Sequence, residues 1–534
     1  MEYADAVNLA AALAIAAFAV WAAMRRRKQG LLKRYGIPGP EPELFLGNWK
    51  EFKKDRIKVM EEWEHLYGKV YGFYEGETPK VVISDMDVIK ECFVKKASLF
   101  TDRPPLVVDI EPIRSSLIGL KGDEWKGLRG MLNPSFTSAK IKHMLDTIHQ
   151  CTDITTDILR ECLSTDGHAT VNISAISQGF SLDIITKCAL GWQSIVLSEK
   201  KNLSFVFFCQ QSDCQRNKDD PVIKTLAKIL TDSGNWINDV CIVTPILGAI
   251  VSYIFPLLSY GKLFARIEKD LQRLLQSRKR TTATASDIVQ LMLEVQRSSS
   301  AVDKEDNDAC ARTPCNVKLK PSFITDRHVV SNCFVFLGAG FDTTASTLAF
   351  LLYELARHPD EQRRLYDDLV AAFPDHERLA YDELQTLKRF DAVINECLRL
   401  YPPLVLTTAR VCQVDTRVAT GHVIPRGSHV ILPTWNVLHD SNLWVDPYKF
   451  DPDRFIERPD SGAVLASALS FGIGPRECIG KRLALLELKV ALSKLIRRFK
   501  FSVSSETQVS LKFKVPLVSL MLERDIVLRV DLRT

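Results

Sequence analysis

The stretch FGIGPRECIG, residues 471–480, places one cysteine among three glycines and two charged side chains. An amphipathic helical pattern follows Cys478, so its thiol should lie near a helix amino terminus, where the dipole and free N–H groups favour a thiolate. The glycines let a flat group approach the backbone, and Arg476 adds a fixed positive charge. These features suit a thiolate that binds haem iron beside an acidic propionate. A buried structural cysteine in a tight turn is the alternative.

A second stretch, residues 336–359, has the pattern of one long helix. It contains Gly338, Gly340, Thr343 and Thr344, which are poor helix formers in mid-helix. Threonine hydroxyls can donate to a carbonyl one turn earlier, which predicts a local distortion and a groove for dioxygen and water. The alternative is a core or membrane-like helix with a glycine packing notch. A dinucleotide-binding loop is not indicated, because the third glycine and a preceding strand are missing, so NADPH is not expected to bind here directly.

Two further pairs of residues have helical spacing. Glu396 and Arg399 are three apart and can pair on one helix face, and Trp125 and Arg129 are four apart. A Glu-x-x-Arg pair is common in helices and carries little weight alone.

The composition excludes several classes of protein. The 534 residues are 46% hydrophobic and 25% charged, which is ordinary for a globular chain and far from disorder. A net charge of +5 without a basic, aromatic-interleaved stripe does not indicate nucleic-acid binding. Thirteen irregularly spaced cysteines argue against a disulfide framework and against a zinc site, and favour a reducing compartment.

The amino terminus has the pattern of a retained membrane anchor. Residues 6–24 are uncharged and about long enough to span a bilayer, and the basic cluster 25–28 follows them directly. A cleaved signal peptide would have the opposite order. We therefore expect an anchor over 1–28 with its basic end cytosolic, a proline-rich hinge over 29–43, and one cytosolic domain over 44–534.

A second apolar run, residues 240–261, contains no charge but includes Pro245 and Pro256. A membrane crossing here would separate Trp125 and Arg129 from Cys478, whereas the family resemblance given below implies that these residues bind one cofactor. Short helices that dip into the membrane surface fit better.

The remaining pattern predicts a mainly α-helical chain with a minor β-sheet region (α+β). Helical periodicity dominates from about residue 87 to 400, and strand signals occur at 69–85 and 410–432. The polar segment 297–321 is expected to be a surface loop.

Together these motifs resemble those of the cytochrome P-450 superfamily, and the resemblance covers nearly the whole chain. The haem-thiolate signature is met by Phe471, Gly474, Arg476, Cys478 and Gly480. Residues 339–344 match the family's oxygen-activation pattern. Weaker similarities, such as YGFYEGETPKVVISD, resemble the clan of family-3 drug-metabolising enzymes and thromboxane synthase. The resemblance implies a triangular fold, with haem between the long mid-chain helix and the helix after Cys478.

The resemblance also implies how haem b would be held. Cys478 would be the axial ligand of the iron. Residues expected to bind the haem propionates are Arg103, Trp125, Arg129, Arg410 and Arg476, and those expected to contact the haem are Ala339, Gly340 and Phe471.

The same resemblance implies roles beyond cofactor binding. Thr343 would stabilise the activated oxygen, and Asp342 would relay protons. Arg454, in a Pro-x-Arg-Phe stretch, would complete a buried ion network with Glu396 and Arg399 that fixes the fold.

The activity implied is a monooxygenase that inserts one oxygen atom of O2 into lipophilic small molecules. Electrons would come from NADPH through a reductase, with cytochrome b5 as a second partner, at the endoplasmic reticulum membrane. Lys121, Lys126, Lys481 and Arg482 could form a basic docking face for the reductase. One alternative is a thromboxane-synthase-like endoperoxide isomerase, which needs no reductase; another is a non-catalytic membrane haem carrier.

Overall fold

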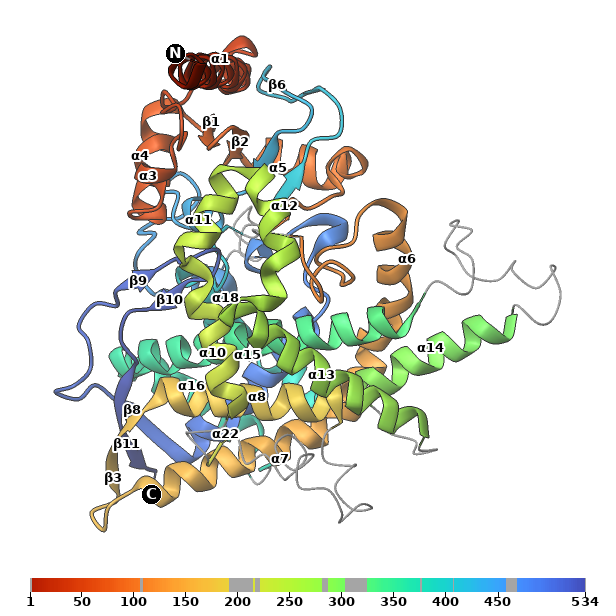
Figure 1. The fold of residues 1–534 in the computed structure, drawn as a ribbon. Coiled ribbons are helices and arrows are strands. Elements are labelled where there is room, and N and C mark those ends of the chain that lie inside the picture. Colours follow the sequence, from red (N-terminus) through yellow and green to blue (C-terminus); the bar gives the residue numbers. More distant parts are fainter. Residues whose placement is uncertain are drawn as a thin grey trace.

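The computed structural model describes residues 2–105, 109–191, 215–216, 221–280, 287–302, 324–374, 377–406, 408–457 and 468–533. The chain forms a wedge, with packed helices at its broad end and a small sheet beside the amino-terminal helix at its narrow end (Figure 1). The expected mainly α fold with a minor β region is confirmed. Of the predicted loop 297–321, residues 297–302 end a helix and 303–323 lie outside the described residues.

The α-helices are as follows: α1 (Glu2–Gln29), α2 (Leu31–Arg34), α3 (Trp49–Phe52), α4 (Arg56–Tyr67), α5 (Met86–Lys90), α6 (Gly122–Leu132), α7 (Ser138–Cys162), α8 (Ile173–Leu190), α10 (Pro221–Thr231), α11 (Trp236–Val243), α12 (Pro245–Ile254), α13 (Ser259–Arg280), α14 (Ile288–Val302), α15 (Asp326–Arg357), α16 (Pro359–Ala372), α17 (Tyr381–Thr386), α18 (Lys388–Leu400), α19 (Thr434–Leu438), α20 (Arg454–Glu457) and α22 (Lys481–Arg498). Short π- and 3₁₀-helical turns occur at η1 (Glu91–Lys95), η2 (Ala97–Phe100), η3 (Asn133–Phe136), η5 (Asp232–Gly234), η6 (Phe255–Leu257), η8 (Ala468–Phe471) and η9 (Gly474–Arg476).

The helical core is built around α15, which packs along α8. The helix begins after Thr325, whose side chain and His328 form a capping box that satisfies free backbone N–H groups. α8 is buried on nearly all sides and so lacks the polar face of a surface helix. Its Ser181 hydroxyl donates to the Gly340 carbonyl at 2.7 Å, which ties the two helices together at the glycine.

Two sheets complete the domain. At the narrow end the order is β1 (Val70–Glu75), β2 (Thr78–Ile83), β7 (His429–Ile431) and β4 (Ala409–Val411), with β2 and β7 parallel. At the broad end, β3 (His168–Asn172), β11 (Val527–Leu532) and β8 (Phe499–Ser502) are antiparallel. Two small antiparallel pairs are β5 (Thr416–Arg417) with β6 (Val423–Ile424), and β9 (Phe513–Lys514) with β10 (Met521–Leu522).

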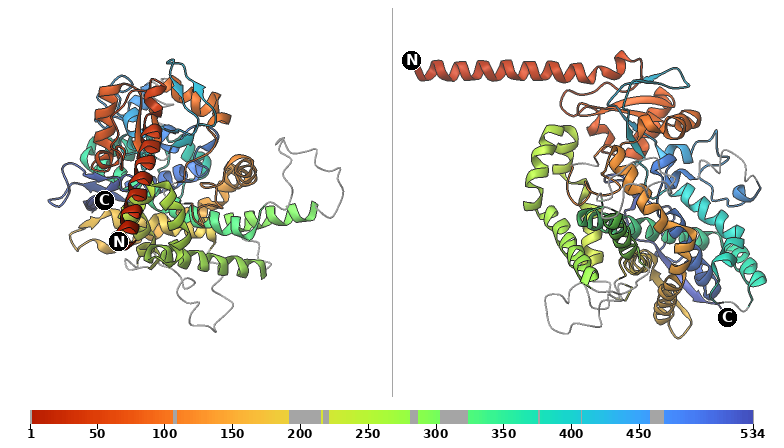
Figure 2. Two further views of the ribbon diagram at one scale, coloured as in Figure 1. Left: turned by 45° about the horizontal axis from the view of Figure 1, so that its top comes forward. Right: turned by 90° about the vertical axis from the view of Figure 1, so that its right-hand side faces the viewer.

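The amino-terminal helix α1 projects from the wedge as a straight rod (Figure 2). It is long and apolar enough to cross a membrane, and its carboxyl-terminal part contacts the domain, first through the rings of Phe18 and Trp21 against Phe45 and then at its basic end. There Arg25, 2% exposed, donates to the carbonyls of Leu44, Phe45 and Val243. Gln29 donates to the Leu44 carbonyl as well and to two further carbonyls, those of Glu43 and Gly76. The end of α1 is therefore fixed to the domain by hydrogen bonds.

The proline-rich segment after the anchor also packs on the domain. The Gly72 N–H of β1 donates to the Pro38 carbonyl at 2.8 Å. A Cβ on Gly39 would lie 1.8 Å from the Gly72 carbonyl oxygen, so only glycine permits this close approach. In the predicted hinge, residues 29–43, Pro38 and Gly39 therefore lie against strand β1.

The apolar run 240–261 forms short helices, as expected: α11, α12 and η6. By length and composition, α12–η6 and α13 also qualify as one candidate span that bends by 62°. α15 qualifies as well, but most of its apolar stretch is buried inside the domain, where it contacts α8.

Candidate functional site

The loop that carries Cys478 is shaped by glycine. Gly472 and Gly474 have φ of +78° and +77°, and a Cβ on Gly474 would meet the Phe93 carbonyl oxygen at 1.9 Å. The Cys478 N–H donates to the Phe471 carbonyl at 2.8 Å, and α22 starts three residues after the cysteine. The thiol is thus placed just before a helix amino terminus, as the sequence predicts.

The Cys478 side chain is one of two exposed cysteines in the described part of the chain; the other is Cys162. Burial among protein atoms raises the pKa of the Cys478 thiol, while the Gly480 N–H and the charges of Arg129 and Arg103 act in the opposite direction. The net effect favours the neutral thiol, so the thiolate expected from the helix amino terminus is not favoured by the protein alone. A metal ion that binds an accessible thiol removes its proton.

Four arginines come together above this loop from separate parts of the chain. They are Arg103, Arg129 of α6, Arg410 of β4 and Arg476 of the cysteine loop. Burial, together with neighbouring arginine charges, lowers the pKa of Arg103 to about 10 and that of Arg476 to about 9, and holds the pKa of Arg410 well below its usual value. The Nε of Arg103 is buried without a hydrogen-bond partner among the described residues.

Buried cations that repel one another and keep a free donor need an anion. The two propionates of a haem are anions of this kind, and Arg103 and Arg129 also lie close enough to Cys478 to affect its pKa. The residues present therefore fit a haem whose iron is held by Cys478 and whose carboxylates face the arginine cluster.

Arg476 also has a structural task. Its guanidinium donates to the carbonyls of Thr101, Leu117 and Leu120, at 2.7–3.0 Å. Three of its five N–H groups thus hold the segment that precedes α6 against the cysteine loop.

The oxygen-activation residues lie on the less buried face of α15. Ala339 is exposed, and Asp342 and Thr343 are half-buried on the same face, one helical turn on. The Thr343 hydroxyl donates to the Ala339 carbonyl at 2.7 Å, which is the expected bond one turn earlier. The helix nevertheless remains α-helical through this point, so the expected distortion is limited to that bond. Burial raises the pKa of the Asp342 carboxyl to about 6.

The two glycines of α15 have different surroundings. A Cβ on Gly340 would lie 2.7 Å from the Ile185 side chain, so this glycine permits the close packing of α8. A Cβ on Gly338 would meet nothing within 4 Å. The role of Gly340 in binding the cofactor stays a prediction; on the side where a Cβ would lie, Gly340 packs against Ile185.

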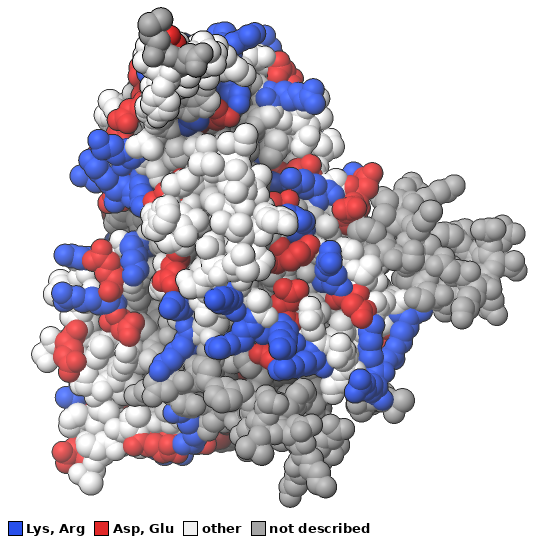
Figure 3. Space-filling model, viewed as in Figure 1, with Lys and Arg blue, Asp and Glu red and all other residues white. Residues whose placement is uncertain are grey.

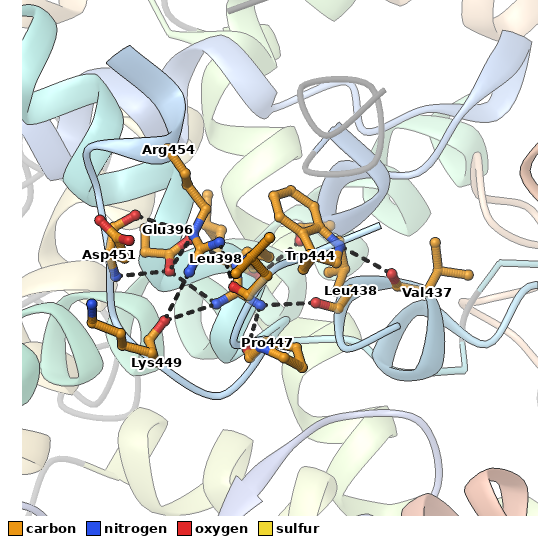
Figure 4. A network of polar contacts seen from close by, with 12 residues as sticks. Glu396, Leu398, Val437, Leu438, Trp444, Pro447, Lys449, Asp451 and Arg454 are labelled. Carbon is orange, nitrogen blue, oxygen red and sulfur yellow. Dashed lines mark hydrogen bonds and ion pairs between the residues drawn. The ribbon is translucent and has the colours of Figure 1, made fainter. Parts of the chain in front are cut away.

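The ion network at Glu396 is present as predicted (Figure 4). Arg399 donates twice to the Glu396 carboxylate, at 2.7 and 2.9 Å, and Arg454 donates at 3.1 Å. Glu396 and Arg399 are fully buried. Residues that the sequence did not identify complete the network: Arg399 also donates to the carbonyls of Leu438, Pro447 and Lys449, and the Trp444 ring lies 5.0 Å from its guanidinium. Every charge is thus paired, as a buried network requires.

Comparison with known proteins identifies the family. The cytochrome P450 family model matches residues 37–232 and 247–529. Human cytochrome P450 3A7 is 31% identical over 514 residues, which cover 95% of this chain and 93% of the relative. Human cytochrome P450 3A5 is 32% identical with the same coverage, and mouse cytochrome P450 3A11 is 32% identical over 94% of both chains. The chain therefore belongs to the cytochrome P450 family and is a haem-thiolate monooxygenase.

Proposed function

We propose that the protein inserts one oxygen atom of O2 into lipophilic small molecules at the endoplasmic reticulum membrane, with electrons from NADPH delivered by a membrane-bound reductase. The observation that carries the proposal is the accessible Cys478 thiol beneath the cluster of buried arginines. The anchor-like helix α1 supports the membrane attachment, with the catalytic domain in the cytosol.

When bound, the haem supplies the activation of dioxygen. Cys478 would hold its iron, and Arg103, Arg129 and Arg410 would orient it through its carboxylates; Trp125, Arg476, Ala339 and Phe471 are proposed to complete its surroundings. Thr343 would present its hydroxyl on the open face of α15, and Asp342 would take up and release protons there. A carboxyl with a pKa near 6 is suited to proton transfer near neutral pH.

This pair of residues favours oxygen insertion over the two alternatives. An endoperoxide isomerase has no dioxygen to reduce, and a haem carrier performs no chemistry, so neither needs a proton relay. The predicted relay residues Asp342 and Thr343 are together on one face of the helix.

The reductase is proposed to dock beside the cysteine loop. Lys121 is exposed, and the Lys481 ammonium lies 5.5 Å from the Phe471 ring centroid. Lys126 is also exposed but pairs with Asp123 at 3.0 Å. Such a basic face suits an acidic redox partner, and cytochrome b5 would use the same face.

The test has two stages. The reduced protein with carbon monoxide is expected to show the red-shifted Soret band of a haem thiolate, lost in Cys478→Ser and kept in the matched exposed-cysteine variant Cys162→Ser. Reconstitution with NADPH and reductase should then yield oxygenated products from lipophilic compounds. A histidine-type band would contradict the ligand assignment. Turnover that is independent of reductase and O2 would support the isomerase instead.

A further inference from the structure

A cavity of about 650 Å³ lies where α1 joins the domain, apart from the residues around Cys478. It is formed by the last turns of α1, the segment 45–54 and the carboxyl end of α11. The tip of the β1–β2 hairpin packs directly against the end of α11 at this junction. The backbones are so close at Gly76 that a Cβ there would lie 1.9 Å from the Val243 carbonyl oxygen. We call this cavity the anchor pocket.

The wall of the anchor pocket is largely apolar and aromatic. The rings of Trp21 and Phe45 have centroids 5.4 Å apart, and Trp49 and Val240 contribute to the same lining. Phe45 is 55% exposed and lies beside the Phe18 ring of α1, so the two rings offer a continuous apolar surface at the mouth of the pocket. Such a wall suits a hydrocarbon chain.

The pocket also carries a basic rim. Arg25, Lys50, Lys53 and Lys54 line it, against the single carboxylate of Asp239. That carboxylate pairs with Lys53, and Arg25 pairs with Glu77 at 3.5 Å. Within the described residues, neither Lys50 nor Lys54 has an ion pair or a side-chain hydrogen bond, and both are exposed. The rim therefore has two cations available to an anion.

Trp49 contributes to the pocket wall mainly as an apolar ring. Its side chain is only 4% exposed, and its indole N–H is buried away from the pocket space. The polar groups that the pocket offers to a headgroup are therefore those of its rim.

The position of the pocket relates it to the membrane. The anchor helix α1 leaves the domain on the side where α11 and α12 lie (Figure 2). Over α12 the surface is uncharged, and basic side chains gather over neighbouring α3 (Figure 3). Ile246, Ile250 and Tyr253 of α12 are exposed. The basic rim lies between two apolar elements, the anchor helix α1 and the exposed face of α12. If both enter the membrane, the rim would lie at the level of the lipid headgroups.

We propose that the anchor pocket binds an anionic phospholipid, with one acyl chain against Trp21, Phe45 and Val240 and the headgroup phosphate at Lys50 and Lys54. The lipid would be an integral part of the joint between the anchor and the domain. The inference rests on the proposed membrane attachment and is independent of the chemistry at Cys478.

The test uses the full-length, haem-loaded protein in phosphatidylcholine vesicles. These contain a trace of phosphatidylserine with a photoreactive acyl chain, or, in parallel, phosphatidylcholine with the same chain. After illumination, mass spectrometry should locate phosphatidylserine adducts in residues 45–54 and α11, with far fewer adducts from phosphatidylcholine. The double variant Lys50→Ala/Lys54→Ala should lower phosphatidylserine labelling roughly tenfold. The matched variant Lys500→Ala/Lys512→Ala, at two exposed lysines outside the pocket, should leave it unchanged.

A second variant tests the apolar half of the pocket. Val240→Trp would fill space while leaving the lysines in place, and should also lower labelling. Equal labelling by the two lipids, or unchanged labelling in both pocket variants, would overturn the proposal. If inorganic phosphate competed with phosphatidylserine labelling, the site would bind anions in general and not a lipid. That result would also overturn the proposal. The carbon monoxide spectrum of each variant reports on haem ligation separately, so a failure of the proposed catalytic function is distinguishable from a failure at the pocket.

Discussion

The guanidinium of Arg476 lies 3.9 Å from the centroid of the Trp125 ring, so that the cysteine loop and helix α6 are stacked on each other. Trp125 is 4% exposed, and a cation over a desolvated indole is stabilised by the charge distribution of the ring. The contact lies between two motifs that are distant in sequence, and it orients the arginine that holds the segment before α6.

We expect Trp125→Ala to lower the free energy of unfolding by about 3–5 kcal/mol, through the cavity and the lost stacking. It should also lower the fraction of protein that retains haem. Trp125→Phe keeps a ring under Arg476 and should lose much less stability, so any haem loss in this variant reports on the indole N–H alone. Chemical unfolding and the carbon monoxide spectrum measure the two effects. Equal stability of the two variants would show that stacking and volume contribute little.

Removal of one partner from the buried ion network should be severe. Glu396→Gln leaves Arg399 and Arg454 without their shared carboxylate, and we expect a loss of about 3–5 kcal/mol. The double variant Glu396→Gln/Arg399→Met also removes the fully buried cation and should be more stable than Glu396→Gln alone. Urea unfolding of both variants measures this difference. The opposite order would mean that the network contributes through volume and not through charge.

The hydroxyl of Thr343 is predicted to act in oxygen activation and not in packing. Thr343→Val keeps the branched shape but removes the donor, while Thr343→Ser restores it. We expect the valine variant to form product at least roughly tenfold more slowly, with NADPH consumption continuing and peroxide released. Product and peroxide are measured for each NADPH oxidised, and the serine variant should recover most of the product. Unchanged product in Thr343→Val would remove the hydroxyl from the mechanism.

Asp342 gives a prediction for the pH dependence of stability. Its pKa is about 6 in the folded protein, above that of an exposed aspartate, so the folded state binds this proton more tightly than the unfolded state. The resulting stabilisation is complete below about pH 4 and is lost as the pH rises through 6. Asp342→Asn should therefore be more stable than wild type above pH 6, by about 1–3 kcal/mol, and the difference should vanish below pH 4.

Thermal unfolding between pH 4 and 8 tests this sign. The exposed Asp367→Asn variant, on α16, serves as the control and should show a much smaller change with pH. A difference between Asp342→Asn and wild type that grows as the pH falls would contradict the burial of this carboxyl.

Part of the site could be predicted from sequence because its residues are close together along the chain, so that helix geometry alone determines their contacts. Cys478 before its helix and Glu396 with Arg399 on one turn need only local geometry. The hydroxyl bond of Thr343 is local in the same way. Periodicity predicted a mainly α-helical chain with strands near 69–85 and 410–432, and this fold class is confirmed.

Other relationships depend on the path of the backbone and had no sequence signal. Arg476 and Arg399 donate mainly to main-chain carbonyls, which every residue type provides. The close packing of Gly340 against Ile185 likewise depends on where another helix lies, and no spacing within the motif indicates it. From sequence, the basic end of the anchor predicted only the orientation of the helix in the membrane. The hydrogen bonds of Arg25 to the domain could not be predicted in this way.

Those bonds between α1 and the domain affect how redox partners would meet. Arg25 and Gln29 fix the last turns of the helix to carbonyls in three separate segments, so the domain would not swivel freely on its tether. With α1 in a bilayer, the tilt of the domain would be set by the tilt of one helix. Its basic face would then stay at a constant height above the lipid. A reductase confined to the same surface would search in two dimensions for a partner already oriented, which reduces the entropy lost at each encounter.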